Sequence, residues 1–153
     1  MTVVEAYKKM ALLCSRREYC ISDIQQKMSR WEMSQKDKTE VVSQLLADNF
    51  IDESRFAEAF VKDKFRFNKW GKNKIIYSLK QKRIADKIIF DALEWISDKD
   101  YRILIKELLE AKYKTQKSEN NYIAKSKLLR FMTQRGFEYD LVNEAIDALF
   151  NKS

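Results

Sequence analysis

Histidine and proline are absent from this 153-residue chain, and only two glycines and two cysteines occur in it. Without histidine, the chain lacks the commonest general base and the commonest metal ligand. Glycines at positions 71 and 136 alone are too few for a GxxxxGK[ST] or a GxGxxG phosphate-binding loop. Two cysteines cannot form a four-thiolate zinc site, so we expect Cys14 and Cys20 to be small buried residues. An enzyme is therefore the least favoured class of protein. It would need an active site built on carboxylates or lysine, and no residue spacing in the sequence indicates one. We expect no cofactor and no metal.

Long hydrophobic runs are also lacking. No apolar stretch approaches the roughly 20 residues that a membrane-spanning helix needs. The first residues, MTVVEAYKKMALLC, carry Glu5 and Lys8 among their apolar side chains and do not resemble a signal peptide. We therefore expect a cytoplasmic protein with no membrane association. Nothing in the sequence requires more than a monomer.

The residues that are present favour helices throughout. Lysine, glutamate, leucine, isoleucine and alanine are abundant, and few residues that break helices interrupt them. One apolar framework, with a four-residue step followed by a five-residue step, occurs three times at offsets of 51 and 53 residues. Its members are Ile24, Met28 and Met33; Ile75, Leu79 and Ile84; and Leu128, Met132 and Phe137. The four-residue step places two side chains on one helical face, and the five-residue step carries the chain through a turn.

This periodicity predicts an all-α fold of three tandem three-helix repeats. We place the repeats at residues 1–50, 51–97 and 98–153. Because each unit is small and packs chiefly on its neighbour, we expect an elongated, curved array.

Helix ends can be located from capping residues. Ser34, Asp52 and Ser97 have the side chains preferred at helix N-termini. Asn49 and Gly136 suit the left-handed conformation that ends a helix. The polar stretch 114–121 (KTQKSENN) predicts a loop or hinge in the third repeat.

Apolar spacing also predicts which faces are buried. In the first helix we expect a buried face at Val4, Tyr7, Ala11 and Leu12. In the helix that opens the second repeat we expect a buried stripe made by Phe56, Ala57, Phe60, Val61 and Phe67. Gly71 is expected to break that helix.

Positive charge is concentrated in one part of the chain. Residues 62–83, which we call the basic segment, contain nine basic side chains and one acidic side chain, a net charge of +8, whereas the whole chain carries +7. Such a block is typical of a surface that meets a polyanion or an acidic partner. A merely solubilising surface tends to mix both signs of charge, which makes that interpretation weaker here. The aromatic side chains between these cations could stack on nucleic-acid bases or pack inside the protein, and for Phe67 we favour packing.

The run Phe50-Ile51-Asp52-Glu53-x-Arg55-Phe56-Ala57-x-x-Phe60 resembles the sequence that joins the first two repeats in the RecX family. Gly71, Ile75, Leu79, Lys82 and Ile84, and then Ile88, Ala92 and Leu93, resemble the rest of that family's second repeat. The resemblance covers nearly the whole chain. Glu32-Met33 and Asn49 depart from the family, which often has glycine at these turns, so they affect local turn geometry more than function.

The resemblance implies a small regulator of the RecA recombinase in DNA repair, homologous recombination and the SOS response. It implies binding in the groove of the RecA filament on single-stranded DNA, with inhibition of filament growth, strand exchange and ATP hydrolysis. It also implies no catalytic chemistry and no cofactor.

Charge clustering, rather than the family, selects the candidate contact residues. They are Arg55, Lys62, Arg66, Lys69, Lys72, Lys74, Lys80, Lys82 and Arg83. The alternative function is direct, largely sequence-independent DNA binding through the same central repeat. Capping and packing mostly explain the family-matching residues Asp52, Phe56, Ala57, Phe60, Gly71, Ile75 and Leu79.

Overall fold

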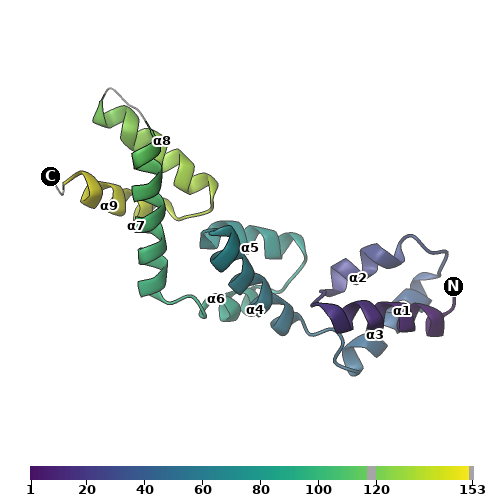
Figure 1. Ribbon diagram of the computed structural model, residues 1–153. Coiled ribbons are helices and arrows are strands. Elements are labelled where there is room, and N and C mark those ends of the chain that lie inside the picture. The colour runs from purple at the N-terminus through teal and green to yellow at the C-terminus, as the bar shows by residue number, and fades with distance from the viewer. Residues whose placement is uncertain (117–119, 152–153) are drawn as a thin grey trace. The chain divides into compact units, whose positions relative to one another are not determined.

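The computed structural model describes residues 1–116 and 120–151, and over these ranges it contains helices and no strand. In chain order the helices are α1 (Val3–Arg16), α2 (Ile21–Met28), α3 (Gln35–Ala47), α4 (Glu53–Asp63), the π-helix η1 (Lys64–Asn68), α5 (Lys72–Gln81), α6 (Asp86–Leu93), α7 (Asp98–Thr115), α8 (Asn121–Gln134) and α9 (Tyr139–Phe150) (Figure 1). The all-α fold class is confirmed. Across the same ranges, every helix is too short or too polar to span a membrane.

The chain divides into two compact units. Unit 1 comprises Met1–Phe60 and Leu79–Ala92, and unit 2 comprises Val61–Ser78 and Leu93–Ser153. Helices α4 and α5 therefore contribute residues to both units. The repeat boundaries at residues 50 and 97 stay a prediction.

Unit 1 is built around α1, α2 and α3, with α3 in contact with both of the others (Figure 1). Its core includes a row along α1 at Ala6, Met10 and Cys14. The predicted face was wrong at Val4 and Leu12, which are 61% and 54% exposed, whereas Tyr7 and Ala11 are partly buried against the core. Apolar residues occur on more than one face of this helix, and the row that is buried in contact with α3 is the one that contains Met10. Cys14 and Cys20 are buried free thiols, as predicted.

Helix ends follow the predicted caps. The hydroxyl oxygens of Ser34 and Ser97 each accept a hydrogen bond from the backbone N–H of the residue three positions later, at 3.1 and 3.0 Å. The Asp52 carboxylate accepts the N–H of Arg55 at 3.0 Å in the same way. Asn49 and Gly136 have φ angles of 62° and 95°, so both predicted left-handed helix ends are confirmed.

The end of α4 differs from the prediction. The helix continues into the π-helix η1, where the wider turn changes which side chains face inward. Phe65, rather than Phe67, packs inside unit 2, against Trp95 and Tyr101, with ring centroids 6.2 and 6.3 Å away. Phe67 is 78% exposed, so its predicted burial was wrong.

Gly71 does not break the helix, as was predicted, but allows two segments of the backbone to approach closely. The helical segment ends at Asn68, and Lys69 adopts the left-handed conformation with φ of 56°. Gly71 instead lies against the backbone of Gly136, in the link between α8 and α9. A Cβ atom on Gly71 would lie 2.3 Å from the carbonyl carbon of Gly136. Glycine is therefore required at position 71 by a close approach of two backbones.

Unit 2 is completed by α7, α8 and α9, which contact one another (Figure 1). Its largest fully buried side chains include Tyr101 and Phe137, whose ring centroids lie 5.5 Å apart. α7 ends at Thr115 and α8 begins at Asn121. The predicted loop at 114–121 includes residues 117–119, which lie outside the described residues.

Candidate functional site

The candidate contact residues occur in both units. Those in unit 2 are Lys62, Arg66, Lys69, Lys72 and Lys74. Those in unit 1 are Arg55, Lys80, Lys82 and Arg83.

Trp95 positions two cations of unit 2. The Nζ atom of Lys62 lies 5.5 Å from the centroid of the indole, and the guanidinium carbon of Arg66 lies 4.6 Å from it. The two residues are one helical turn apart, at the end of α4 and in η1. Each such contact contributes about 0.5–1 kcal/mol at an exposed site. The indole thus restricts the conformational freedom of two long side chains that would otherwise be mobile.

A second aromatic side chain, Trp70, also lies against two cations. The Nζ atoms of Lys64 and Lys74 lie 4.9 and 4.6 Å from its ring centroid. Lys69, between them in sequence, is exposed at the left-handed end of η1. Ammonium groups are therefore held at defined positions on both sides of the turn at residues 69–71.

Lys72 is fixed by Tyr101, a buried residue of α7. Its backbone N–H donates to the Tyr101 hydroxyl oxygen at 2.9 Å, and its Nζ atom lies 4.7 Å from the centroid of the phenol ring. The Tyr101 hydroxyl in turn donates to the carboxylate of Glu138. Burial, followed by this hydrogen bond, raises the pKa of Tyr101, so the phenol stays protonated and remains a donor. The N-terminus of α5 is thereby tied to α7.

A further cation joins this group from α8. Arg135 stacks on Phe131, with its guanidinium carbon 5.1 Å from the ring centroid, and donates from Nη1 to the Asn68 carbonyl oxygen at 3.2 Å. Together with Trp70 and Lys74 it lines an open pocket of about 370 Å³. The pocket brings side chains from the basic segment and from α8 together.

In unit 1, Arg55 is engaged within the protein. Its Nε atom lies 2.7 Å from the Glu18 carboxylate, and its Nη2 atom donates to the Asn49 carbonyl oxygen at 2.9 Å. The hydrogen bond to Glu18 raises the pKa of Arg55 further. These contacts join α4 to the chain that follows α1.

Lys82 and Lys80 also have carboxylate partners. The Nζ atom of Lys82 lies 2.8 Å from Asp23, and that of Lys80 lies 3.7 Å from Asp86. Burial raises the pKa of Asp23, but hydrogen bonds from Lys82 and Cys20 outweigh it, so that the pKa falls below its usual value. Arg83 is exposed, with φ of 62° at the turn that follows α5. Three of the four candidate cations of unit 1 therefore have carboxylate partners within that unit.

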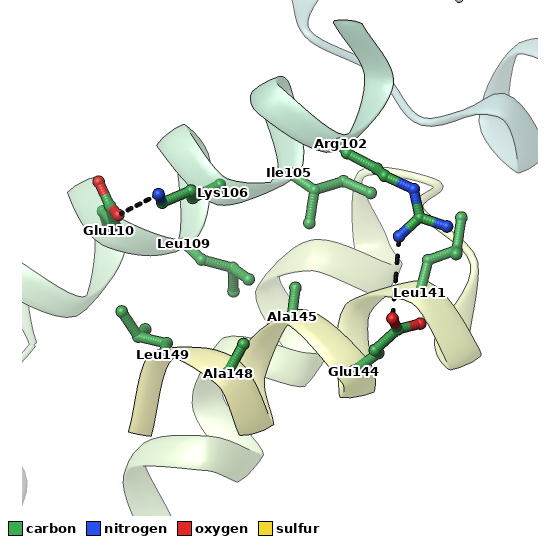
Figure 2. Close-up of a pocket in the computed structure, with 10 residues that line it drawn as sticks. All are labelled: Arg102, Ile105, Lys106, Leu109, Glu110, Leu141, Glu144, Ala145, Ala148 and Leu149. Carbon is green, nitrogen blue, oxygen red and sulfur yellow. Dashed lines mark ion pairs between the residues drawn. The ribbon is translucent and has the colours of Figure 1, made fainter. Parts of the chain in front are cut away.

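Unit 2 also carries an apolar groove between α7 and α9, shown in Figure 2. Ile105, Leu109 and Ala145 lie along it, and its volume is about 270 Å³. Its charged residues pair with one another, Arg102 with Glu144 at 3.9 Å and Lys106 with Glu110 at 4.0 Å. Because these charges cancel, the groove does not select a charged ligand.

Several residues that lie beside the candidate cations of unit 2 were not anticipated from the sequence. Trp95 and Tyr101 each lie 29 residues from the cation that they contact, Arg66 and Lys72 respectively, and Arg135 lies 65 residues from Trp70 in the shared pocket. No local spacing connects them to the basic segment. A signal existed only for Trp70, which lies between cations in the sequence itself.

The arrangement can bind anions, and its chemistry suits association more than catalysis. Ammonium and guanidinium groups are gathered in pairs over Trp95 and over Trp70, and such groups can contact phosphate or carboxylate groups. The aromatic rings beneath them reduce the entropy that these side chains lose on binding.

The chain matches known proteins along most of its length. Residues 52–93 match the family model of the second three-helix domain of RecX, and residues 103–146 match that of the third. The regulatory protein RecX of Chlorobium phaeobacteroides is 30% identical over 146 residues, which is 95% of this chain and 94% of the relative. That of Clostridium perfringens strain SM101 is 32% identical over 105 residues, or 67% of this chain. The chain spans about half the length of the clostridial relative, 49%.

Solved structures agree on the fold. A crystal structure of regulatory protein RecX has a TM-score of 0.86 at 21% identity, covering 95% of this chain and 73% of the other. RecX from Lactobacillus salivarius has a TM-score of 0.83 at 21% identity, covering 97% of both chains. Since a relative at 30% identity is aligned over almost its entire length and both family models match in order, the chain belongs to the RecX family.

Proposed function

We propose that this chain binds the RecA filament on single-stranded DNA and inhibits its growth, strand exchange and ATP hydrolysis. The contact is made by the basic segment, together with Arg55, and the chain acts as a monomer without catalytic chemistry of its own. The relatives are named regulatory proteins, which supports a regulator rather than an enzyme.

One observation carries the proposal. Lys62 and Arg66 share Trp95, and Lys74 lies on Trp70, so the cations of unit 2 are held in place by rings of the same unit. A mobile solubilising surface needs no such positioning. A surface that repeatedly contacts one anionic assembly gains from it, because less entropy is lost on association.

Within the proposed surface, the unit 2 cations are expected to contribute most. Arg55, Lys80 and Lys82 have carboxylate partners inside unit 1, so binding would have to compete with existing ion pairs. Lys69 and Arg66 are exposed. We therefore assign the first contact with the filament to these two exposed side chains of unit 2.

The steady-state ATPase activity of RecA on single-stranded DNA tests the proposal. We expect the rate to fall by about half or more at about one micromolar chain, the concentration at which a binding free energy of about −8 kcal/mol gives half occupancy. An unchanged rate at tenfold higher concentration would contradict it. A DNA-dependent helicase ATPase on the same DNA serves as the control and is expected to keep its rate.

Direct DNA binding is the second candidate function. The +8 net charge of residues 62–83 favours it, because lysine and arginine contacts to phosphates release counterions. In the ATPase experiment, equal inhibition of RecA and the helicase would indicate competition for DNA and would favour this alternative.

A further inference from the structure

A polar pocket in unit 1 is not explained by the proposed contact with RecA. Its volume is about 330 Å³. It is lined by Arg17, Tyr19, Asp23, Gln26, Lys27, Arg30 and Lys82. These residues come from the link between α1 and α2, from α2 itself, from the turn after α2 and from the turn after α5. Only Lys82 belongs to the basic segment.

Three cations of this pocket have no carboxylate partner. Within residues 1–116 and 120–151, Arg17, Lys27 and Arg30 form no ion pair. The guanidinium carbon of Arg17 lies 4.8 Å from the centroid of Tyr19, and the Nζ atom of Lys27 lies 5.2 Å from the same point. One ring therefore holds two like charges near each other, an arrangement whose repulsion an anionic ligand would relieve.

The single carboxylate of the pocket is already engaged. Asp23 accepts hydrogen bonds from Lys82 at 2.8 Å and from the Cys20 backbone N–H at 3.3 Å. These hydrogen bonds outweigh burial and lower the pKa of Asp23, so it stays ionised and paired. Four cations and one anion give the pocket a net charge of +3.

We propose that this pocket binds successive phosphate groups of a single-stranded nucleic acid. One phosphodiester carries a single negative charge, which neutralises only part of the pocket, whereas neighbouring phosphates of one strand supply several. Two arginines offer the forked donors that match phosphate oxygens, and Gln26 adds an amide donor. Acidic peptide is the competing ligand, since successive carboxylates also carry repeated charge. Phosphate is favoured because its tetrahedral oxygens can accept from several converging donors at once.

Lysine footprinting on the full chain tests the site without RecA. The chain is mixed with a twenty-residue oligothymidylate at near-physiological salt, treated briefly with an amine-acetylating reagent, and analysed by mass spectrometry. We expect acetylation of Lys27 to slow by about fivefold or more when the oligonucleotide saturates the chain, because a phosphate contact covers its ammonium group. Lys8 and Lys9, exposed on α1 outside the pocket, are the internal controls and are expected to keep their rates. Unchanged acetylation of Lys27 at saturation would overturn the proposal.

A double variant, Arg17→Ala with Arg30→Ala, tests the role of the pocket. We expect it to lose the protection of Lys27, while the lysines of the basic segment that belong to unit 2, outside the pocket, keep theirs. The matched control, Lys8→Ala with Lys9→Ala, removes the same charge from the same unit and is expected to keep the protection of Lys27. Far-ultraviolet circular dichroism verifies that both variants fold. Retained protection of Lys27 in the folded pocket variant would contradict the site.

A polyglutamate peptide of equal charge identifies the ligand class. We expect it to protect Lys27 much less than the oligonucleotide does. Equal protection by the peptide would overturn the assignment to nucleic acid in favour of an acidic protein segment. These results do not depend on RecA, so failure of the pocket is distinguishable from failure of the proposed regulation.

Discussion

Replacing Gly71 with alanine is expected to destabilise unit 2 by about 3–5 kcal/mol, the upper part of the range for single substitutions. The new Cβ would lie 2.3 Å from both the Gly136 carbonyl carbon and the Phe137 backbone nitrogen. Since both atoms belong to a backbone, no rotamer change can relieve the overlap. Separation of the two segments would also break the hydrogen bonds from the Gly71 N–H to the Arg135 oxygen, at 2.8 Å, and from the Asn73 N–H to the Gly136 oxygen, at 2.9 Å.

Urea unfolding followed by circular dichroism and tryptophan fluorescence measures this effect. Ser126→Ala is the matched control, because Ser126 is exposed on α8 of the same unit and its loss is expected to change the free energy of unfolding by less than about 0.5 kcal/mol. If Gly71→Ala changed the free energy of unfolding by less than about 1 kcal/mol, the close approach of the two backbones would be refuted.

Reversing the charge at Lys62, Arg66 and Lys69 is expected to raise the concentration for half-inhibition of RecA ATP hydrolysis by about 30-fold, or about 2 kcal/mol. All three belong to unit 2, and Lys62 and Arg66 lie over one indole, Trp95. Substitution with glutamate removes attraction to an anionic filament and adds repulsion. Helical content is expected to persist, because each cation–π interaction that the substitutions remove stabilises the fold by only about 1 kcal/mol.

The matched control reverses three exposed lysines of unit 1, Lys8, Lys9 and Lys36, and so produces the same change in net charge. We expect a less than about threefold loss of inhibition, since exposed charges that make no direct contact with a partner are largely screened at physiological salt. Equal losses in the two variants would show that the net charge of the chain determines inhibition, and not the position of Lys62, Arg66 and Lys69. Unfolding of the first variant would show that its three cations support the fold rather than bind a partner.

Local sequence signals predicted helix ends well. Ser34, Asp52 and Ser97 cap their helices through hydrogen bonds that span three residues, and such contacts depend only on neighbouring sequence. Asn49 and Gly136 likewise adopt the left-handed conformation that their residue types favour. The repeated apolar framework is buried at Ile24, Ile75 and Leu128, which made the tandem helical fold predictable.

Contacts between distant segments could not be predicted. Periodicity placed Phe67 in the core on the assumption of a continuous α-helix, but the π-helix moves Phe65 inward instead. The pairing of Gly71 with Gly136 spans 65 residues, and the sharing of Trp95 by Lys62 and Arg66 spans about 30. For the candidate site, the sequence therefore identified the cations but not the rings that position them.

The most direct test of the central claim compares binding of the chain to bare single-stranded DNA and to the same DNA coated with RecA, at about 0.15 M salt. A regulator that docks on the filament is expected to bind the coated DNA at least about tenfold more tightly, a difference of about 1.4 kcal/mol. Equal or tighter binding to the bare strand, with RecA activity unchanged, would contradict filament docking and would leave direct DNA binding as the function of the basic segment.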